Sequence, residues 1–327
     1  MAKNLPEHRP NSMRVDVEVR PTLLLTGCNG QLGFELQQRL AILGRVVALD
    51  RVACDLAQPA ALRKAVREVR PDVIVNAAGY TDVDRAEAET EQAFAINGLA
   101  VGLLAEEAKA MGSLLVHYST DYVFDGRKSG PYLEVDAANP LSIYGKSKLA
   151  GDLAIAQSGA HALVFRTGWV AGMHGPNFAK TILRLGRERH ALRVVADQVG
   201  GPTTAELIAE VTTDLLARYW QFDDRQSFPF GLYHVAAAGQ VSWHDYAVEV
   251  LRHAQKRGVA LRAGPEHVVP ISAADYSAVA PRPAYSCLDT SKLRKTFDIG
   301  LPDWKVGLLR MLDQILHLPE FTVRDVQ

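Results

Sequence analysis

The chain has 327 residues, of which 48% are hydrophobic and 22% charged, with a formal net charge of -1 at neutral pH. Such a composition is typical of a globular protein with one large or two moderate domains, and its balanced charge favours neither nucleic acid nor an anionic membrane as a partner. No apolar run approaches the roughly 20 residues that span a bilayer. Three widely spaced cysteines, Cys28, Cys54 and Cys287, argue against a disulfide framework. We therefore expect a cytoplasmic protein whose residues 1–20 form a flexible tail.

After that tail, short apolar runs alternate with amphipathic stretches. Helices are expected at 33–43, 62–69, 91–111 and 147–158. They separate expected strands at Thr22–Thr26, 46–49, Val73–Asn76, 114–118 and 162–165. Fully apolar strands alternating with helices predict a parallel sheet covered on both faces, which is a doubly wound, Rossmann-type α/β fold.

The alternation loosens after residue 170. Helices are expected at 178–189, 206–220, 242–257 and Trp304–Leu316, with one late strand at 232–236. We interpret residues 21–170 as a dinucleotide-binding domain to which the late strand returns. Residues 171–327 are interpreted mainly as a smaller C-terminal domain for a substrate, placed over the ligand edge of the sheet.

A glycine-rich turn lies between the first strand and the first helix. Gly27, Gly30 and Gly33 are spaced to permit a tight turn, the close approach of a pyrophosphate and tight packing of the helix on the strand. The following helix N-terminus offers unpaired backbone N–H groups to phosphates. Asp50 ends the second strand, where an acid that binds a ribose is expected. Together these features predict a site for NADH or NADPH.

Asp50 and its neighbour Arg51 favour different cofactors. The Asp50 carboxylate can accept a hydrogen bond from a free 2′-hydroxyl, whereas the Arg51 guanidinium can neutralise a 2′-phosphate. The choice between NADH and NADPH is therefore open at this point.

Three polar side chains are arranged for the reduction of a ketone. Tyr144 and Lys148 are four residues apart, so on a helix they share one face, and Thr120 ends the strand before them. A phenol normally titrates near 10, which is too high for an ideal acid at neutral pH. A nearby ammonium favours the phenolate and lowers the phenol pKa, and the threonine hydroxyl can bond to the carbonyl oxygen.

The order of these features matches the extended short-chain dehydrogenase/reductase superfamily. Finer motifs run through nearly the whole chain after the tail: Gly30-Gln-Leu-Gly33, Arg70-Pro-Asp-Val-Ile-Val-Asn76, Tyr118-Ser-Thr-Asp-Tyr-Val-Phe-Asp-Gly126, Arg166-Thr-Gly-Trp-Val170 and Asp197-Gln-Val-Gly-Gly-Pro-Thr203. In these motifs the chain resembles the dTDP-4-dehydrorhamnose reductases. The resemblance implies NAD(P)H-dependent reduction of the 4-keto group of dTDP-4-dehydro-β-L-rhamnose to give dTDP-β-L-rhamnose.

The resemblance also implies roles for individual residues. Tyr144 becomes the proton donor, Lys148 its partner and Thr120 the third polar group, while Asp121 and Trp169 match positions that face the sugar nucleotide. The residues that match the cofactor site, besides Tyr144 and Lys148, are Gly27, Gly30, Gln31, Leu32, Gly33, Asp50, Asp55, Leu56, Ala78, Gly79 and Tyr80.

Some reductases of this family hold magnesium at a dimer contact through acidic side chains. Glu35 and Glu206 match two of those positions, but the third is Gln314, beside Asp313. Oxygen ligands suit magnesium. The chain thus leaves two alternatives, a magnesium site with a homodimer or ordinary acids on helix surfaces.

Two other functions are compatible with the fold. One is a non-catalytic relative, such as the NADP-binding regulatory subunit of methionine adenosyltransferase, and the other is a sugar-nucleotide epimerase. The intact set of Thr120, Tyr144 and Lys148 favours catalysis. Tyr122 follows Asp121 where dehydratases usually carry a glutamate, which disfavours dehydration.

Overall fold

The fold is described from a computed structural model, in which residues 20–318 are placed well enough to describe. Apart from Arg20, the expected tail of residues 1–20 lies outside the described residues. Among the described residues, the helices are all too short or too polar to cross a membrane.

A six-stranded, fully parallel sheet forms the centre of the molecule, with the strand order β10-β5-β4-β3-β1-β2. Its strands are β1 (Thr22–Thr26), β2 (Arg45–Leu49), β3 (Val73–Asn76), β4 (Leu114–Thr120), β5 (Ala162–Thr167) and β10 (Gly231–His234). Strand β10 comes from the second half of the chain and pairs with β5, so it extends the sheet built by the first half.

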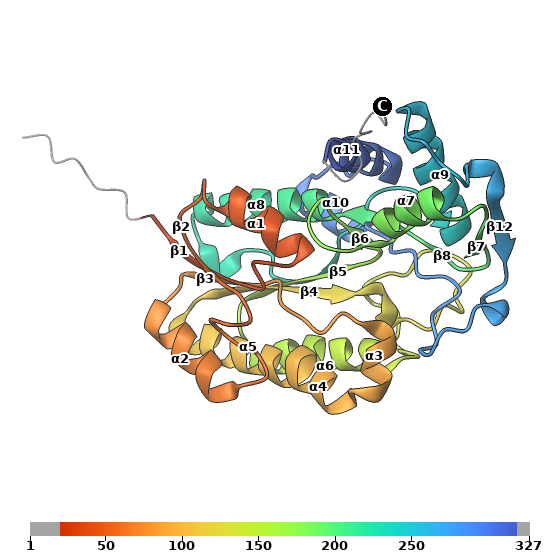
Figure 1. The fold of residues 1–327 in the computed structure, drawn as a ribbon. Helices are drawn as coiled ribbons and strands as arrows, with labels where there is room; N and C mark the ends of the chain where they lie inside the picture. Colours follow the sequence, from red (N-terminus) through yellow and green to blue (C-terminus); the bar gives the residue numbers. More distant parts are fainter. Residues whose placement is uncertain (1–19, 319–327) are drawn as a thin grey trace, which may run out of the picture.

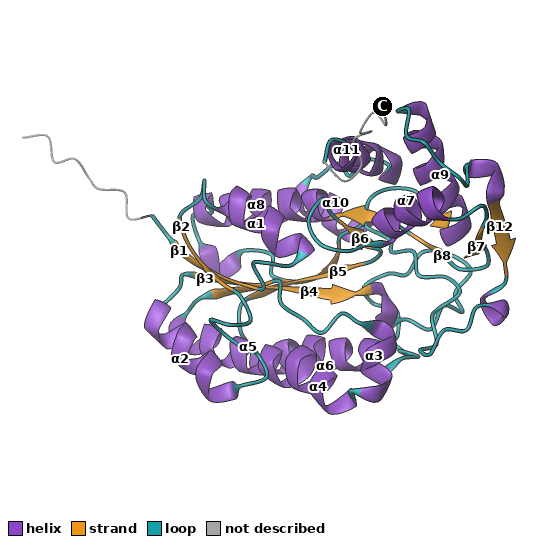
Figure 2. Ribbon diagram, viewed as in Figure 1, coloured by secondary structure: helices purple, strands orange, loops and turns teal. Residues whose placement is uncertain are grey.

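Helices cover both faces of the sheet (Figures 1 and 2). One face carries α2 (Pro59–Val69), α5 (Ala100–Met111) and α6 (Ile143–Ser158), and the other carries α1 (Gln31–Leu40) and α8 (Ala205–Gln221). Successive strand residues point to opposite faces. Leu23 and Leu25 of β1 therefore join the core beneath α1 and α8, while Leu24 joins the core beneath α2 and α5.

The second half of the chain supplies the remaining helices and strands, and many of them lie towards the carboxyl ends of the central strands (Figure 2). They include α7 (Phe178–Glu188), α9 (Trp243–Lys256), α10 (Ser291–Phe297) and α11 (Trp304–Leu316), and the parallel pair β7 (Leu192–Val195) and β12 (Val268–Ile271). The short strands are β6 (Val170–Ala171), β8 (Val199–Gly200), β9 (Thr203–Thr204) and β11 (Val241–Ser242). Buried side chains of these helices and strands belong to the same core as those beneath α1 and α8, so the second half of the chain packs directly on the sheet.

The helix expected at 91–111 is interrupted. After α3 (Val83–Ala88), the chain forms α4 (Thr90–Phe94), a π-helical turn η1 (Ala95–Leu99) and then α5. A π-helical turn inserts one extra residue into a helix and is frequent at functional sites. Here it turns Asn97 into the interior, where its side chain is fully buried.

Candidate active site

A cleft of about 790 Å³ opens at the carboxyl ends of β1 to β5. Ligands bind at this edge in open parallel sheets, and the volume falls in the range of about 300–1,000 Å³ that ligand pockets occupy. All the residues predicted for the cofactor line this cleft except Gly33: Gly27, Gly30, Gln31, Leu32, Asp50, Asp55, Leu56, Ala78, Gly79, Tyr80, Tyr144 and Lys148.

The glycine turn is closed by backbone contacts that leave no room for side chains. Gly27 has a φ of +71°, and a Cβ there would lie 2.6 Å from the Ala78 amide nitrogen. At Gly33 a Cβ would lie 2.0 Å from the Gly27 carbonyl oxygen. Gly33 therefore acts behind the cleft, where it lets α1 pack on the turn. Within the described chain no side chain caps α1 at Gly30, so its first amide groups remain available to an anion.

Asp50 lines the cleft directly after β2, and neighbouring groups orient its carboxylate. Its Oδ1 accepts hydrogen bonds from the amides of Val52 and Ala53 at 3.0 and 2.9 Å, and its Oδ2 accepts one from Asn29 at 3.2 Å. The carboxylate keeps free lone pairs for a ribose hydroxyl. Arg51 is exposed beside it, with its Nε 3.9 Å from Asp55 Oδ2.

Two of the predicted catalytic side chains, Tyr144 and Lys148, line the same cleft, whereas Thr120 is buried and is not among the lining residues. Ser142 caps α6 by accepting a hydrogen bond from the Gly145 amide, and this places Tyr144 and Lys148 in the first turns of the helix. The Thr120 hydroxyl donates to Asp121 Oδ1 at 3.1 Å and lies close enough to the Tyr144 phenol to lower its pKa. The Lys148 ammonium donates to the Tyr118 carbonyl at 2.5 Å and lies against Gly79.

Burial controls the protonation of this group. It raises the pKa of Tyr144 to about 12, although the hydrogen bond with Thr120 lowers it. It lowers the pKa of Lys148 to about 8, against the effect of the Asp152 carboxylate. The lowering of the Tyr144 pKa that was expected from Lys148 is therefore not found, because burial dominates and the phenol keeps its proton at neutral pH. A protonated phenol has a proton to donate, and a nearby positive charge stabilises the phenolate that remains.

Asn97 is a polar residue that the sequence patterns did not single out. Its Oδ1 accepts from the Tyr80 amide at 2.8 Å, and its Nδ2 donates to the Tyr80 carbonyl at 2.9 Å and to the Ser147 hydroxyl at 3.0 Å. It thereby ties the loop after β3 to α6, next to Lys148. No motif marks it, and the π-helical turn that carries it cannot be read from periodicity.

The two residues expected to face the sugar, Asp121 and Trp169, are not among the residues that line the cleft. Asp121 is buried, and burial raises its pKa to about 7, although the hydroxyls of Ser286 and Thr120 lower it. Its Oδ2 has no hydrogen-bond partner among the described residues. Trp169 has a left-handed φ of 47° and stacks on Trp243 with ring centroids 3.3 Å apart. It thus packs between the sheet and the second half.

Glu35 and Glu206 lie on the packed helices α1 and α8, near enough that Glu206 helps to raise the pKa of Glu35, after burial. The charge of Glu206 is already balanced, because its Oε1 lies 3.2 Å from Arg39 and 3.5 Å from Arg310. Asp313 is bound by His253 and Arg257. Within residues 20–318 no three acidic, histidine or cysteine side chains are placed to hold a metal. One chain therefore does not supply a magnesium site by itself, and the site expected at a dimer contact stays a prediction.

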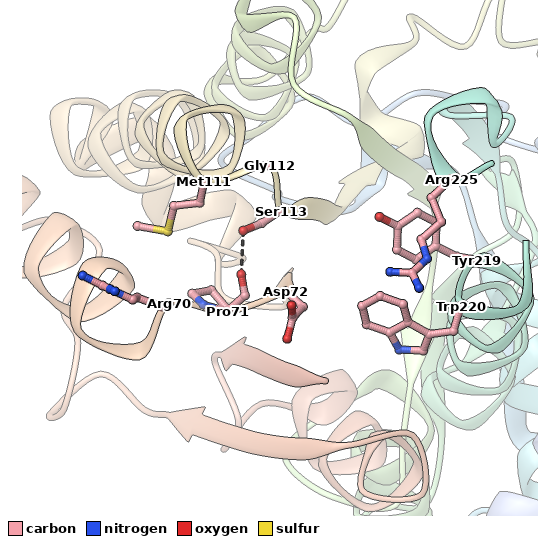
Figure 3. Close-up of a pocket in the computed structure, with 9 residues that line it drawn as sticks. All are labelled: Arg70, Pro71, Asp72, Met111, Gly112, Ser113, Tyr219, Trp220 and Arg225. Atoms are coloured by element: carbon pink, nitrogen blue, oxygen red, sulfur yellow. Dashed lines mark hydrogen bonds between the residues drawn. The ribbon is translucent and has the colours of Figure 1, made fainter. Parts of the chain in front are cut away.

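A second pocket of about 320 Å³ lies at the opposite end of the sheet, before β3 and β4 (Figure 3). Figure 3 shows the Arg225 guanidinium beside the Trp220 ring, 4.6 Å from its centroid, and the Ser113 hydroxyl donating to the Pro71 carbonyl. None of the predicted site residues lines it, so the candidate site is confined to the carboxyl edge.

Comparisons with known proteins agree with this geometry. The family model "RmlD substrate binding domain" matches residues 21–317. A dTDP-4-dehydrorhamnose reductase of Burkholderia thailandensis is 46% identical over 288 residues, covering 88% of this chain and 97% of that protein. One from Escherichia coli is 44% identical, covering 90% and 97%.

A solved structure extends the likeness to three dimensions. The dTDP-4-dehydrorhamnose reductase of Bacillus anthracis, in complex with NADP, has a TM-score of 0.80 and 32% identity, with 90% of this chain and 99% of that chain covered. The family match, the sequence relatives and the shared fold all point the same way, and the chain belongs to the dTDP-4-dehydrorhamnose reductase family.

Proposed function

We propose that this protein reduces the 4-keto group of dTDP-4-dehydro-β-L-rhamnose to give dTDP-β-L-rhamnose, with NADPH or NADH as the hydride donor. The observation that carries the proposal is that Tyr144 and Lys148 line one cleft with the residues predicted for the cofactor, while the Thr120 hydroxyl lies near the Tyr144 phenol. Relatives at 44 to 46% identity that carry the same reductase name support the choice of substrate.

Different residues are proposed to bind the cofactor and the sugar nucleotide. The amides at the start of α1 would hold the cofactor diphosphate, Asp50 the adenosine ribose, and Lys148 the nicotinamide ribose. The cofactor supplies the hydride. Asp121 and Trp169 are proposed on the sugar-nucleotide side, to which residues 171–327 mainly contribute.

The positions of the chain's own residues indicate the source of the proton. As the carbonyl carbon gains a hydride, its oxygen becomes an alkoxide and takes the proton of Tyr144, while Thr120 donates a hydrogen bond to that oxygen. The Lys148 cation stabilises the phenolate until solvent returns the proton.

Both reduced cofactors are proposed to serve. NADP is the ligand named for the Bacillus anthracis structure, and Arg51 is exposed at the edge of the cleft, where a 2′-phosphate would need a cation. Asp50 keeps acceptor capacity for the free 2′-hydroxyl of NADH. The ratio of kcat/KM for the two cofactors, measured in the protein and in Arg51→Ala, tests this: NADPH turnover should fall more than NADH turnover.

The reaction is tested by mixing the protein with NADPH and the 4-keto sugar nucleotide and following the absorbance of the reduced cofactor. Tyr144→Phe should lower turnover by at least about 100-fold, because the proton donor is lost. Tyr233→Phe is a matched control, since Tyr233 is buried, its hydroxyl donates to the Pro229 carbonyl, and it does not line the cleft. Equal turnover of Tyr144→Phe and the control would remove Tyr144 from its role.

The two alternatives make different predictions in the same assay. An epimerase would leave the absorbance of added NADPH unchanged and would keep its cofactor through purification. A regulatory subunit would bind NADP but show no turnover with the sugar nucleotide. Either result would replace the reductase proposal.

A further inference from the structure

A buried carboxylate lies one helical turn beyond Lys148, on the same face of α6. Asp152 Oδ2 accepts a hydrogen bond from Arg166 Nε of β5 at 3.0 Å, and the two side chains are 7% and 6% exposed. Its Oδ1 makes no hydrogen bond within the described chain, although the Ser119 hydroxyl lies near it. The carboxylate therefore pairs with the buried Arg166 cation, and Lys148 lies one helical turn before it on α6, close enough for the Asp152 charge to raise the Lys148 pKa.

The other groups around Lys148 do not replace this negative charge. His117 of β4 is fully buried, and burial together with Lys148 holds its pKa well below the usual range, so it is neutral. Asp121, next to β4, has its pKa raised to about 7 by burial and is hydrogen bonded by Thr120. Tyr144 on α6 is an uncharged phenol at neutral pH.

The outer helices packed on α6 direct their charged groups elsewhere. Glu87 of α3 accepts from the Ile143 amide at the start of α6, and Glu91 of α4 is exposed. On α5, Glu107 is bound by Arg63 and Arg67, and Lys109 donates to the Ser158 carbonyl at the far end of α6. Asp152 is thus the carboxylate that acts on Lys148 from within the protein core.

We propose that Asp152 is a positioning residue for the reduction: shared between Lys148 and Arg166, it keeps the Lys148 ammonium protonated inside the buried site. This inference rests on the proposed function, in which a charged Lys148 supports proton donation by Tyr144.

The physical reason is the unequal acidity of the two cations. Two buried positive charges without an anion are costly, and one of them must lose its proton or draw in a counter-ion. A guanidinium does not deprotonate in proteins, whereas a buried ammonium does so readily. Removing the charge of Asp152 should therefore neutralise Lys148 and leave Arg166 charged. Removing Arg166 should do the opposite, because Lys148 would have the carboxylate to itself.

The test compares Asp152→Asn with Arg166→Met, two variants that break the same buried ion pair. The measurement is kcat/KM for the sugar nucleotide between pH 5.5 and 9, at saturating NADPH. In the unchanged protein we expect activity to fall above about pH 8, as Lys148 loses its proton. In Asp152→Asn this fall should move down by at least about one pH unit, since one pKa unit is a tenfold change in equilibrium. Activity should recover at pH 6.

In Arg166→Met the same fall should move to higher pH, although this variant removes a larger buried group than Asp152→Asn does. Opposite shifts cannot come from a general loss of structure, so they separate an electrostatic role from a structural one. A loss that is equal at every pH in both variants, or an unmoved profile in Arg166→Met, would overturn the proposal. If Asp152→Asn does not fold, Arg166→Met and Asp152→Glu still test it, because Asp152→Glu should keep the profile of the unchanged protein.

A second readout does not depend on turnover. Acetylation of Lys148 by acetic anhydride, followed by mass spectrometry across the same pH range, reports the neutral amine directly. Labelling should begin at lower pH in Asp152→Asn and at higher pH in Arg166→Met. Absence of sugar-nucleotide turnover with these labelling shifts present would refute the proposed function alone. Turnover without any shift would refute the role of Asp152 alone.

Discussion

Replacing Gly33 with alanine should cost the protein both stability and cofactor binding. Gly33 lies in the first turn of α1, and an added Cβ would lie 2.0 Å from the Gly27 carbonyl oxygen and 2.8 Å from the Cys28 Cα. Both are backbone atoms, and Cβ contacts under 3.0 Å are essentially never seen. The helix must therefore move by about 1 Å away from the glycine turn. Overpacking of this kind typically costs about 1–3 kcal/mol.

The same movement opens the turn that would hold the cofactor diphosphate. We expect the free energy of unfolding to fall by about 2 kcal/mol, and the Kd for NADPH to rise by about 100-fold, or about 2.7 kcal/mol. Urea denaturation measures the first quantity and fluorescence titration with NADPH the second.

Gly30→Ala is the matched control for this experiment. Gly30 has an ordinary φ of -78°, and a Cβ there would lie 3.3 Å from the Gly27 carbonyl oxygen. That contact needs an adjustment of only a few tenths of an ångström. Gly30→Ala should keep most of the stability and lose affinity, because Gly30 lines the cleft. Normal stability and normal NADPH affinity in Gly33→Ala would refute the reasoning from close approach.

Three further predictions concern other parts of the molecule. Gly168→Ala would place a Cβ 2.5 Å from Asp121 Oδ2, so KM for the sugar nucleotide should rise several-fold while Kd for NADPH, measured by titration, stays the same. Hydrogen bonds from Arg67 lower the pKa of buried Glu107 below its usual 4.5, so this pair stabilises the fold above pH 4.5 and the effect is lost as the pH falls through the lowered pKa. Glu107→Gln should therefore lower the free energy of unfolding, measured by urea denaturation, by about 1–3 kcal/mol at pH 7 and by less at pH 3. An equal loss at both pH values would contradict this. Because Glu206 is already paired with two arginines, addition of millimolar Mg²⁺ or of EDTA should leave the Tm of the protein unchanged. The molecular mass measured by light scattering should not change either. A rise of Tm with Mg²⁺ would show that the acids do bind the metal.

Elements that have an unambiguous local sequence pattern could be predicted from the sequence together with their first and last residues. Strands β1 and β3 and helix α11 have the expected bounds, because uninterrupted apolar runs and a full amphipathic helix leave little ambiguity. Helix α6 begins four residues earlier than expected, at Ile143, since the polar stretch around Lys146 hides its first turn. The π-helical turn before α5 was missed because its cause, the burial of Asn97, is a tertiary contact.

The candidate site likewise has residues that the sequence predicts and contacts that it does not predict. The residues predicted for the cofactor follow strand ends, and the parallel topology brings strand ends together, so these residues line one cleft. The environment of Glu206 could not be predicted, because Arg39 and Arg310 reach it from two different helices. The stacking of Trp169 on Trp243 likewise joins residues that no local pattern connects.

The transfer of a labelled hydride tests the central claim most directly. The protein is incubated with dTDP-4-dehydro-β-L-rhamnose and NADPH that carries deuterium at the transferable position of the nicotinamide, and the sugar product is examined by mass spectrometry and proton NMR. The account predicts one deuterium at C4 of dTDP-β-L-rhamnose for each NADPH consumed. A product without deuterium at C4, or a changed sugar with no net NADPH oxidation, would contradict it.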